Sequence, residues 1–407
     1  MTTIRRRDFN AAILMGATAG ARGLFGRASS IDETLKAGVM AHKIPAATAM
    51  VATADHVTYT GAFGKRDSAI DSPLTADAIF SIASMTKAIT STATMQLVER
   101  GKLGLDEPAA KHLPELAKLE VLNGFDSAGK PILKPATKDV TLRNLLTHTS
   151  GFCYPYWDPQ MFEYQSKVKP ANPGGLLTPL MFEPGTRWQY GTGVDWAGRL
   201  VEAVSGMNLE DYFQKNILQP LGMKDTTYIL KAEQFDRLVS TYNRQPDGTL
   251  KETPRKMPSP PKQYPGGGGL YSTTADYVRF MQMILNQGAG PDKHRILESK
   301  TAQSMSSNQI GNIQAGKMRS FRSDLSADID LHPGESDRHT LGFLLNPKAY
   351  EGGRSARSLA WAGIFNTFYW IDPKRKLCAV LMMQFLPFVD KEAIGLLGEF
   401  ERSVYAV

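Results

Sequence analysis

Ser84 and Lys87 are the two residues of this chain whose types and spacing best suit a chemical step. They lie three positions apart in Ser84-Met85-Thr86-Lys87, at the start of a stretch, 84–99, whose apolar residues recur with helical spacing. Residues three apart share one face of a helix, so the lysine amine can reach the serine hydroxyl. A serine hydroxyl becomes a good nucleophile only beside a base or a charge. The spacing therefore predicts a serine nucleophile activated by lysine.

The same spacing occurs three more times in the chain, so it is weak when taken alone. The other pairs are Ser127/Lys130, Ser166/Lys169 and Ser259/Lys262. None of them begins a stretch of helical apolar spacing, and neighbouring glycine and proline favour turns. The alternative for Ser84 and Lys87 is structural: a serine that caps the helix and a solvated lysine in its first turn.

Tyr190 is the second candidate, because it follows a Pro184-Gly185 turn and precedes Gly191 and a new helix. A nearby lysine ammonium would lower the pKa of a tyrosine from its ordinary value of about 10. Tyr190 could then serve as a base for the serine and as an acid for the leaving group. The alternative is an aromatic residue of the core or of its rim.

Trp361-Ala362-Gly363-Ile364 begins a carboxy-terminal strand pair. A glycine in an edge strand lets a substrate approach the backbone. The N–H of Ile364 could then join that of Ser84 to hold an oxyanion. The alternative is a structural bulge at Gly363.

The elements that must position these residues come from both ends of the chain. A helix is expected over Ser30–His42, and strands over Ala46–Ala52, His56–Phe63, Asn366–Ile371 and Leu377–Phe385, before a closing helix over Lys391–Val404. Strands from the two ends complete one antiparallel sheet only if the middle of the chain is inserted between them. The predicted class is therefore α/β (α+β), with a sheet lobe from about 29–80 and 340–407 and a mainly helical lobe from about 81–339.

The inserted lobe is expected to contain helices over Val194–Val204 and Leu209–Leu218. Three segments have loop composition: Pro170–Pro179, Gln245–Gly269 and Asn308–His339. The last is long, polar and without periodicity, so it is expected to be partly disordered, or else a lid over a site.

The amino terminus accounts for much of the net charge of +7. Arg6-Arg7 followed by an Ala/Gly-rich apolar segment is typical of a twin-arginine export signal, here residues 1–28. This predicts a periplasmic or secreted protein; the alternative is a basic tail on a cytoplasmic one. No basic stripe of the kind that binds nucleic acid is present, and no other run reaches the ~18 apolar residues of a membrane span.

The absence of several motifs excludes some classes of metal site, nucleotide site and hydrolase. Cys153 and Cys378 have no metal-binding spacing; free buried thiols are expected, with a single disulfide as the alternative. The sequence lacks H-E-x-x-H, the Walker loop, G-x-G-x-x-G and G-x-S-x-G. The proposed serine chemistry requires no metal and no organic cofactor.

Six segments, in order along the chain, give the sequence a specific resemblance. It resembles the serine β-lactamase-like family on its class C side, and is most similar to family VIII carboxylesterases and related acyltransferases. The segments are Ser84–Lys87, Gly104–Pro108, Leu145–Gly151, Phe182–Tyr190, Pro220–Met223 and Gly267–Thr273.

The resemblance implies a β-lactamase/transpeptidase-like fold and a role for each matching residue. Ser84 is implied as nucleophile, Lys87 as its activating partner and Tyr190 as general base. The backbone N–H groups of Ser84 and Ile364 are implied as the oxyanion hole. His148 and Ser150 correspond to scaffold residues beside the site.

Two departures from the family pattern indicate esters rather than lactams. Lactamases and peptidases of this fold carry Lys or His, then Thr or Ser, then Gly, where this chain has Trp361-Ala362-Gly363. A tryptophan offers an apolar wall and no cation for a substrate carboxylate. Thr192 stands where class C lactamases have Asn. Substrate-binding residues are therefore expected at Trp361, Gly363 and Thr192 and, from their position after the His-Thr-Ser-Gly motif, at Tyr154, Tyr156 and Trp157; packing is the alternative for these three aromatics.

The expected function is a serine hydrolase that cleaves small-molecule carboxylic esters through a Ser84 acyl-enzyme. The enzymatic alternatives are a β-lactamase, a D-Ala-D-Ala carboxypeptidase, or an acyltransferase to an alcohol or amine. The non-enzymatic alternative is a module that binds cell-wall peptide, although such a module needs no activated nucleophile.

Overall fold

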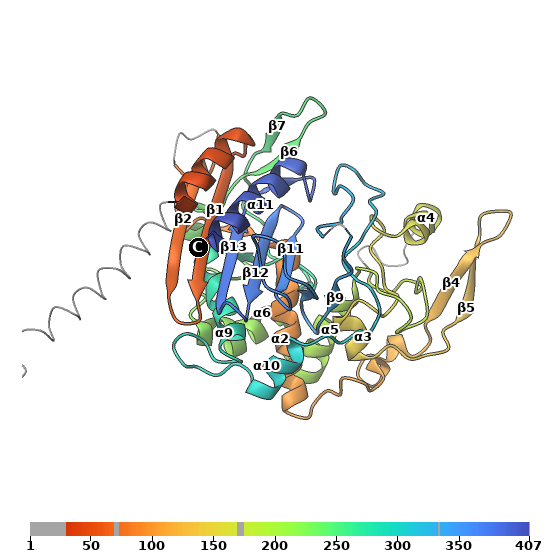
Figure 1. Cartoon of the computed structure of the whole chain (residues 1–407). Coiled ribbons are helices and arrows are strands. Elements are labelled where there is room, and N and C mark those ends of the chain that lie inside the picture. The colour runs from red at the N-terminus through yellow and green to blue at the C-terminus, as the bar shows by residue number, and fades with distance from the viewer. Residues whose placement is uncertain (1–29, 69–72, 169–174, 333, 407) are drawn as a thin grey trace, which may run out of the picture.

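The computed structural model describes residues 30–68, 73–168, 175–332 and 334–406 (Figure 1). Its largest element is a seven-stranded sheet in the order β2-β1-β13-β12-β11-β10-β9. All neighbouring strands are antiparallel. The strands are β1 (Ala46–Thr53), β2 (Val57–Gly64), β9 (Arg338–His339), β10 (Leu344–Leu345), β11 (Leu359–Gly363), β12 (Thr367–Asp372) and β13 (Leu377–Met382). Strands from the two ends of the chain thus form one sheet, as predicted.

Helices cover both faces of this sheet. A helix over residues 30–41 and α11 (Lys391–Tyr405) pack on one face, where the Trp370 and Phe400 rings lie 5.5 Å apart. On the other face, α9 (Thr274–Leu285) packs against β1 and β13. Central strand β13 is apolar and buried on both sides, as expected between two helical layers, whereas edge strand β2 is partly exposed.

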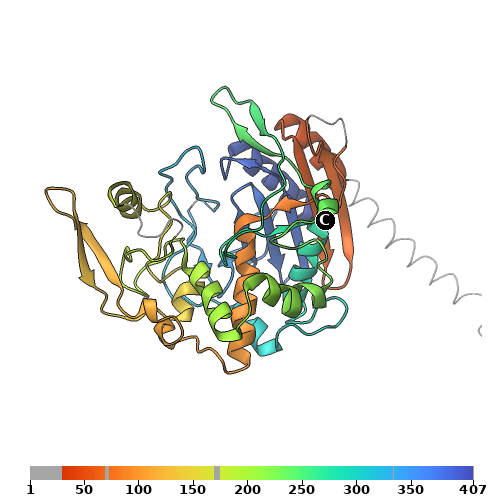
Figure 2. The same cartoon turned by 180° about the vertical axis from the view of Figure 1, so that it is seen from behind.

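The inserted part of the chain is built around α2 (Thr86–Glu99), the long orange helix that lies in front of the sheet in Figure 2. Every α2 residue from Thr86 to Leu97 is buried, because α5 (Gly193–Ser205) and α6 (Leu209–Phe213) pack against it. The remaining helices are α3 (Leu142–Leu146), α4 (Pro159–Lys167), α7 (Gln219–Leu221), α8 (Ala232–Phe235) and α10 (Ser299–Met305), with a π turn over Gln214–Leu218 and short 3₁₀ turns over Ala83–Met85, Ala109–Lys111 and Pro114–Leu116.

Short strands outside the large sheet join distant segments. β3 (Phe80–Ser81) pairs with β8 (Tyr271–Ser272), and β4 (Glu120–Phe125) pairs with β5 (Pro131–Pro135) in a hairpin that the sequence analysis did not predict. A third small sheet has the order β14-β6-β7. Its strands are β14 (Phe385–Leu386), β6 (Thr241–Arg244) and β7 (Leu250–Thr253).

Two of the expected loops contain more structure than predicted. β7 lies inside Gln245–Gly269; its short, polar sequence carries little periodic signal, and its pairing with β6 makes it a strand. In the segment Asn308–His339, the described residues are not a disordered loop. Isolated bridges between Met318 and Ile329 and between Ala315 and Asp337 order it internally, and a bridge between Ser326 and Phe388 joins it to the rest of the protein.

Two further predictions concern the amino terminus and the cysteines. The predicted export signal lies outside the described residues, so a periplasmic or secreted location stays a prediction. Within the part of the chain that the structure describes, no helix is both long and apolar enough to cross a membrane. Cys153 and Cys378 are both buried and free, which confirms the prediction of free thiols.

The place of a valine in the large sheet predicts how much its replacement by alanine lowers the stability of the protein. Val380 in central β13 is fully buried, whereas Val57 in edge strand β2 is 47% exposed. We expect Val380→Ala to lower the free energy of unfolding by about 2–3 kcal/mol, from lost burial and the cavity left behind. Val57→Ala should cost less than about 1 kcal/mol, mainly strand propensity. Urea unfolding of both variants measures the difference; equal costs would contradict the central place of β13.

Candidate active site

Ser84 lies in the 3₁₀ turn Ala83–Met85 that leads into α2. Ala83 has φ +43°, a strained value for a residue with a Cβ, and such strain is common at functional sites. Ser84 does not cap the helix, since Met85 occupies the cap position and no side chain caps it. The capping alternative is therefore wrong, and the serine hydroxyl is available for other contacts.

Lys87 is only 3% exposed, so the solvated alternative for it is also wrong. Its Nζ donates hydrogen bonds to Ser84 Oγ at 3.2 Å, to Tyr154 Oη at 3.2 Å and to the Gly267 carbonyl at 2.5 Å. The β3–β8 pair and a hydrogen bond from Ile82 N to Leu270 O bring the Gly267 loop against the Ser84 turn. The fold thus holds the amine at the serine hydroxyl.

Asp195 is a further member of this cluster that the sequence analysis missed. Its Oδ1 accepts from Gly267 N at 2.9 Å, and its Oδ2 lies 3.5 Å from the Tyr154 hydroxyl, which donates to it. The available signal was an aspartate at a buried position of α5, directly before Trp196. Buried carboxylates need partners, and here the partners are the groups that surround Lys87.

Burial sets the electrostatics of this cluster. Desolvation lowers the pKa of Lys87 to about 8, and the charge of Asp195 opposes that fall. Desolvation likewise raises the pKa of Asp195, opposed by Lys87 and by the Gly267 N–H. A neutral amine at Lys87 is therefore accessible close to neutral pH, where it can accept a proton.

Tyr190 is buried, and Lys87 Nζ faces its ring at 4.8 Å from the centroid. No described group makes a well-formed hydrogen bond with Tyr190 Oη. Burial raises the pKa of Tyr190, although the nearby Ser84 and Trp361 side chains oppose the rise. The expected lowering of this pKa is wrong, because desolvation outweighs the lysine, which faces the ring.

Tyr154 rather than Tyr190 hydrogen-bonds the lysine amine. Its pKa lies well above the ordinary value, through burial first and then through the charge of Asp195. Both tyrosines are therefore protonated and act as hydroxyl groups at neutral pH. The roles of Ser84, Lys87 and Tyr190 in catalysis stay predictions.

Gly363 allows β11 to approach the turn that carries Ser84. A Cβ built at Gly363 would lie 2.4 Å from both the Ile82 carbonyl and Thr367 Oγ1. Gly363 lies opposite Thr367 in a regular ladder, so the predicted alternative of a bulge is wrong. Among the described residues, no acceptor binds the backbone N–H of Ser84 or of Ile364, which leaves both free for the oxyanion role predicted for them.

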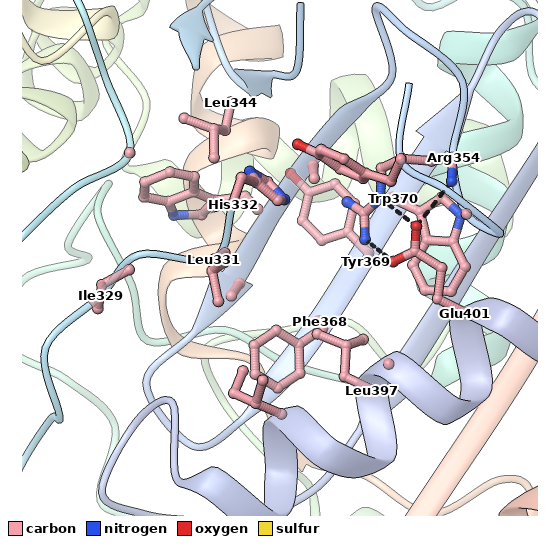
Figure 3. Close-up of a pocket in the computed structure, with 18 of the residues that line it drawn as sticks. Ile329, Leu331, His332, Leu344, Arg354, Phe368, Tyr369, Trp370, Leu397 and Glu401 are labelled. Atoms are coloured by element: carbon pink, nitrogen blue, oxygen red, sulfur yellow. Dashed lines mark hydrogen bonds and ion pairs between the residues drawn. The ribbon is translucent and has the colours of Figure 1, made fainter. Parts of the chain in front are cut away.

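A cavity of about 420 Å³ opens beside Ser84 and Tyr190. Of the predicted substrate-binding residues, Tyr156, Trp157 and Trp361 line it. Tyr154 lies behind it on Lys87, Thr192 is the N-cap residue of α5, and Gly363 packs on Ile82. Figure 3 shows that β12, α11 and the segment around Ile329–His332 also contribute walls of this cavity.

His148 supports the site and is held uncharged. Its ring stacks on Trp361 with centroids 6.2 Å apart, and its Nδ1 accepts from Gly191 N at 3.4 Å. Burial holds the pKa of His148 well below its ordinary value, and His339 and Lys87 add to that effect. A neutral histidine bonded to the backbone fits the expected scaffold role.

Comparison with known proteins adds relatives that match most of the chain. The family model described as Beta-lactamase matches residues 31–398. The chain is 30% identical over 404 residues to the monacolin J acid methylbutanoyltransferase of Aspergillus terreus, covering 92% of this chain and 95% of the relative. It is 32% identical over 396 residues to the lovastatin esterase of Penicillium rubens, covering 92% and 98%.

A solved structure is similar to this chain over most of its length. The unliganded simvastatin synthase of Aspergillus terreus superimposes with a TM-score of 0.80 at 29% identity, covering 93% of this chain and 98% of that one. The predicted β-lactamase/transpeptidase-like fold is thereby confirmed. With the serine, lysine and tyrosines gathered at one site, this chain belongs to the β-lactamase family and is an enzyme related to its serine hydrolases.

Proposed function

We propose that this enzyme is a carboxylesterase that cleaves small-molecule esters through an acyl group carried on Ser84. The observation that carries the proposal is the 3.2 Å contact between Lys87 Nζ and Ser84 Oγ, at the mouth of a largely apolar cavity. A buried amine beside a hydroxyl is the arrangement that makes a serine nucleophilic. The apolar walls favour an uncharged ester over a charged peptide.

The proton movements follow from the pKa directions. Neutral Lys87 takes the proton of Ser84 as Oγ attacks the ester carbonyl, and the N–H groups of Ser84 and Ile364 stabilise the oxyanion. As the carbonyl reforms, the leaving alkoxide receives that proton from Lys87. Water then attacks the acyl group by the same route, releasing the acid and restoring Ser84. Tyr154 and Tyr190 remain protonated and supply hydrogen-bonding hydroxyls, so this proposal gives Lys87 the base role that the sequence analysis expected of Tyr190.

The two rival functions in cell-wall chemistry are less well supported. Trp361 stacks on a neutral histidine, so this position of β11 offers no cation to a lactam or peptide carboxylate. A binding module would not need a desolvated lysine at its serine, because burying an amine costs free energy that only its reactivity justifies.

Acyl transfer to an alcohol is the second candidate function. Relatives of similar identity are named as a methylbutanoyltransferase and as a lovastatin esterase. Both activities share an acyl-enzyme and differ in whether an alcohol or water attacks it. The apolar cavity beside Ser84 could admit an alcohol in place of water.

The nucleophile is tested with p-nitrophenyl butyrate and nitrocefin. We expect rapid ester cleavage, much slower nitrocefin cleavage, and a loss of at least about a thousandfold in kcat/KM for Ser84→Ala. Ser127→Ala, in the exposed turn of the β4–β5 hairpin, is the matched control and should retain full activity. Ester cleavage that survives in Ser84→Ala would remove the proposed nucleophile, and rapid nitrocefin turnover would favour a lactamase.

The lysine base predicts a pH dependence. Lys87 can accept a proton only above its pKa, so kcat/KM for p-nitrophenyl butyrate should rise with pH through a midpoint of about 8. Asp195→Asn removes a charge that raises this pKa, so the midpoint should fall by on the order of one pH unit. Asp55→Asn, at an exposed turn, is the control and should not move it. An upward shift in Asp195→Asn would contradict Lys87 as the base.

The two candidate functions differ in the product formed when an alcohol competes with water. With p-nitrophenyl butyrate as donor and butan-1-ol as acceptor, we expect butyric acid to be the main product, measured by gas chromatography. Butyl butyrate as the main product at millimolar alcohol would instead favour the transferase. Ser84→Ala should form neither product, which separates enzymatic transfer from the background reaction.

A further inference from the structure

The cavity that begins at Ser84 ends at a buried ion pair that the proposed mechanism does not use. Arg354 donates to Glu401 of α11 from Nε at 2.9 Å and from Nη2 at 2.5 Å. Arg354 is 6% exposed, and its guanidinium lies over the Trp370 ring at 5.0 Å from the centroid. Both charged residues line the cavity, and Figure 3 shows them at the end opposite Ile329.

A second polar pair lies on the same wall. His332 Nδ1 is 2.6 Å from Asp337 Oδ2, and the His332 ring stacks on Tyr350 with centroids 4.2 Å apart. The guanidinium of Arg354 also faces the Tyr350 ring, at 5.8 Å. His332 and Arg354 therefore both lie against Tyr350, and all three line the cavity.

Two polar atoms at this end of the cavity have no hydrogen-bond partner among the described residues. Asp337 occupies Nδ1 of His332 and leaves Nε2 without a hydrogen-bond partner in the part of the chain that the structure describes. Among the described residues, none accepts from Nη1 of Arg354, which leaves a donor. A hydroxyl group can both donate and accept, so it matches these two positions together.

The charge at this end favours a neutral group. Three acidic residues, Glu335, Glu351 and Glu401, line the cavity with two arginines, Arg354 and Arg402, and Glu401 already balances Arg354, so the lining has no excess of cations for an added carboxylate. Apolar side chains, Leu344, Phe368 and Leu397 among others, also line the cavity. A ligand that spans the cavity must therefore be apolar in its middle.

We propose that the far end of the cavity recognises a neutral hydroxyl group of the substrate, separated by an apolar segment from the ester carbonyl at Ser84. This inference rests on the proposed function and specifies its substrate class. The hydroxyl belongs either to the acyl part or to the alcohol part of the ester, and the two parts are tested separately.

The experiment compares pairs of esters that differ only in a terminal hydroxyl. One series holds p-nitrophenol constant and lengthens the acyl chain from butanoate to tetradecanoate, with a methyl or a hydroxyl at its end. The other holds acetate constant and lengthens the alcohol in the same way, using mono-acetates of diols. We expect one series to contain a length at which the hydroxyl raises kcat/KM about tenfold.

Two substitutions at His332 test whether its Nε2 bonds the hydroxyl group of the substrate. In His332→Asn, the amide N–H replaces the contact with Asp337 but nothing replaces Nε2, so the hydroxyl preference should disappear. In His332→Gln, the longer amide reaches the Nε2 position and should restore part of the preference. A merely structural role for His332 would affect both esters of a pair equally, and that result would overturn the proposal.

A substitution on α11 tests the path between the two ends. Gly398 lines the cavity, and a Cβ there meets only the flexible Arg402 side chain. Gly398→Leu should fill the passage and move the preferred chain length to shorter esters. Lys391→Leu adds the same side chain to the exposed start of the helix and should leave the length profile unchanged.

Direct binding separates this proposal from the proposed function. Ser84→Ala is titrated calorimetrically with methyl decanoate and methyl omega-hydroxydecanoate, and with decyl acetate and the mono-acetate of decane-1,10-diol, together with the longer and shorter homologues of each pair. Tighter binding of a hydroxyl compound, by about tenfold in Kd, supports the far-end site even if no ester is cleaved. Equal binding at every length overturns it, while p-nitrophenyl butyrate cleavage by the unmodified enzyme would still support the esterase.

Discussion

The site depends on the burial of one amine at the start of the central helix. Removing Lys87 from water lowers the pKa of its amine, and the fold compensates with a carbonyl, a tyrosine hydroxyl and a serine hydroxyl as acceptors. Asp195 limits that fall by its charge while it holds the Gly267 loop in place. The same contacts that satisfy the buried amine also point it at the serine, so stability and reactivity have one origin here.

The large sheet serves this cluster by holding β11 against the turn that carries Ser84. Gly363 permits the approach because the Ile82 carbonyl occupies the space of a Cβ. The approach brings the N–H of Ile364 beside the serine and presents Trp361 to His148 and Tyr190. A cation at the position of Trp361 would suit an anionic group of a substrate. The tryptophan of this chain instead gives the site a wall of aromatic rings.

The segment 308–339 shows how tertiary contacts order a polar sequence. Its residues have no periodicity that predicts an element, yet internal bridges and the His332–Asp337 pair order the described part, and the Ser326–Phe388 bridge joins it to the rest of the protein. The proposed nucleophile Ser84 lines the cavity beside this segment, and so do the Arg354–Glu401 ion pair and His332. The wall between them is apolar because β12 and α11 present core residues to it.

The sequence by itself determined strands β1, β2, β12 and β13, the central helix and the pairing of Ser84 with Lys87, because periodicity and short-range spacing are local properties. It could not place Tyr154 on the lysine, Asp195 behind it, or Tyr190 with its ring toward the amine, since these contacts join segments more than 60 residues apart. The direction of the Tyr190 pKa followed from burial, which only the packed structure defines. The local pattern therefore predicted the elements and the Ser84–Lys87 pair. Tertiary packing decided the partners of the site residues, their protonation and the shape of the cavity that they face.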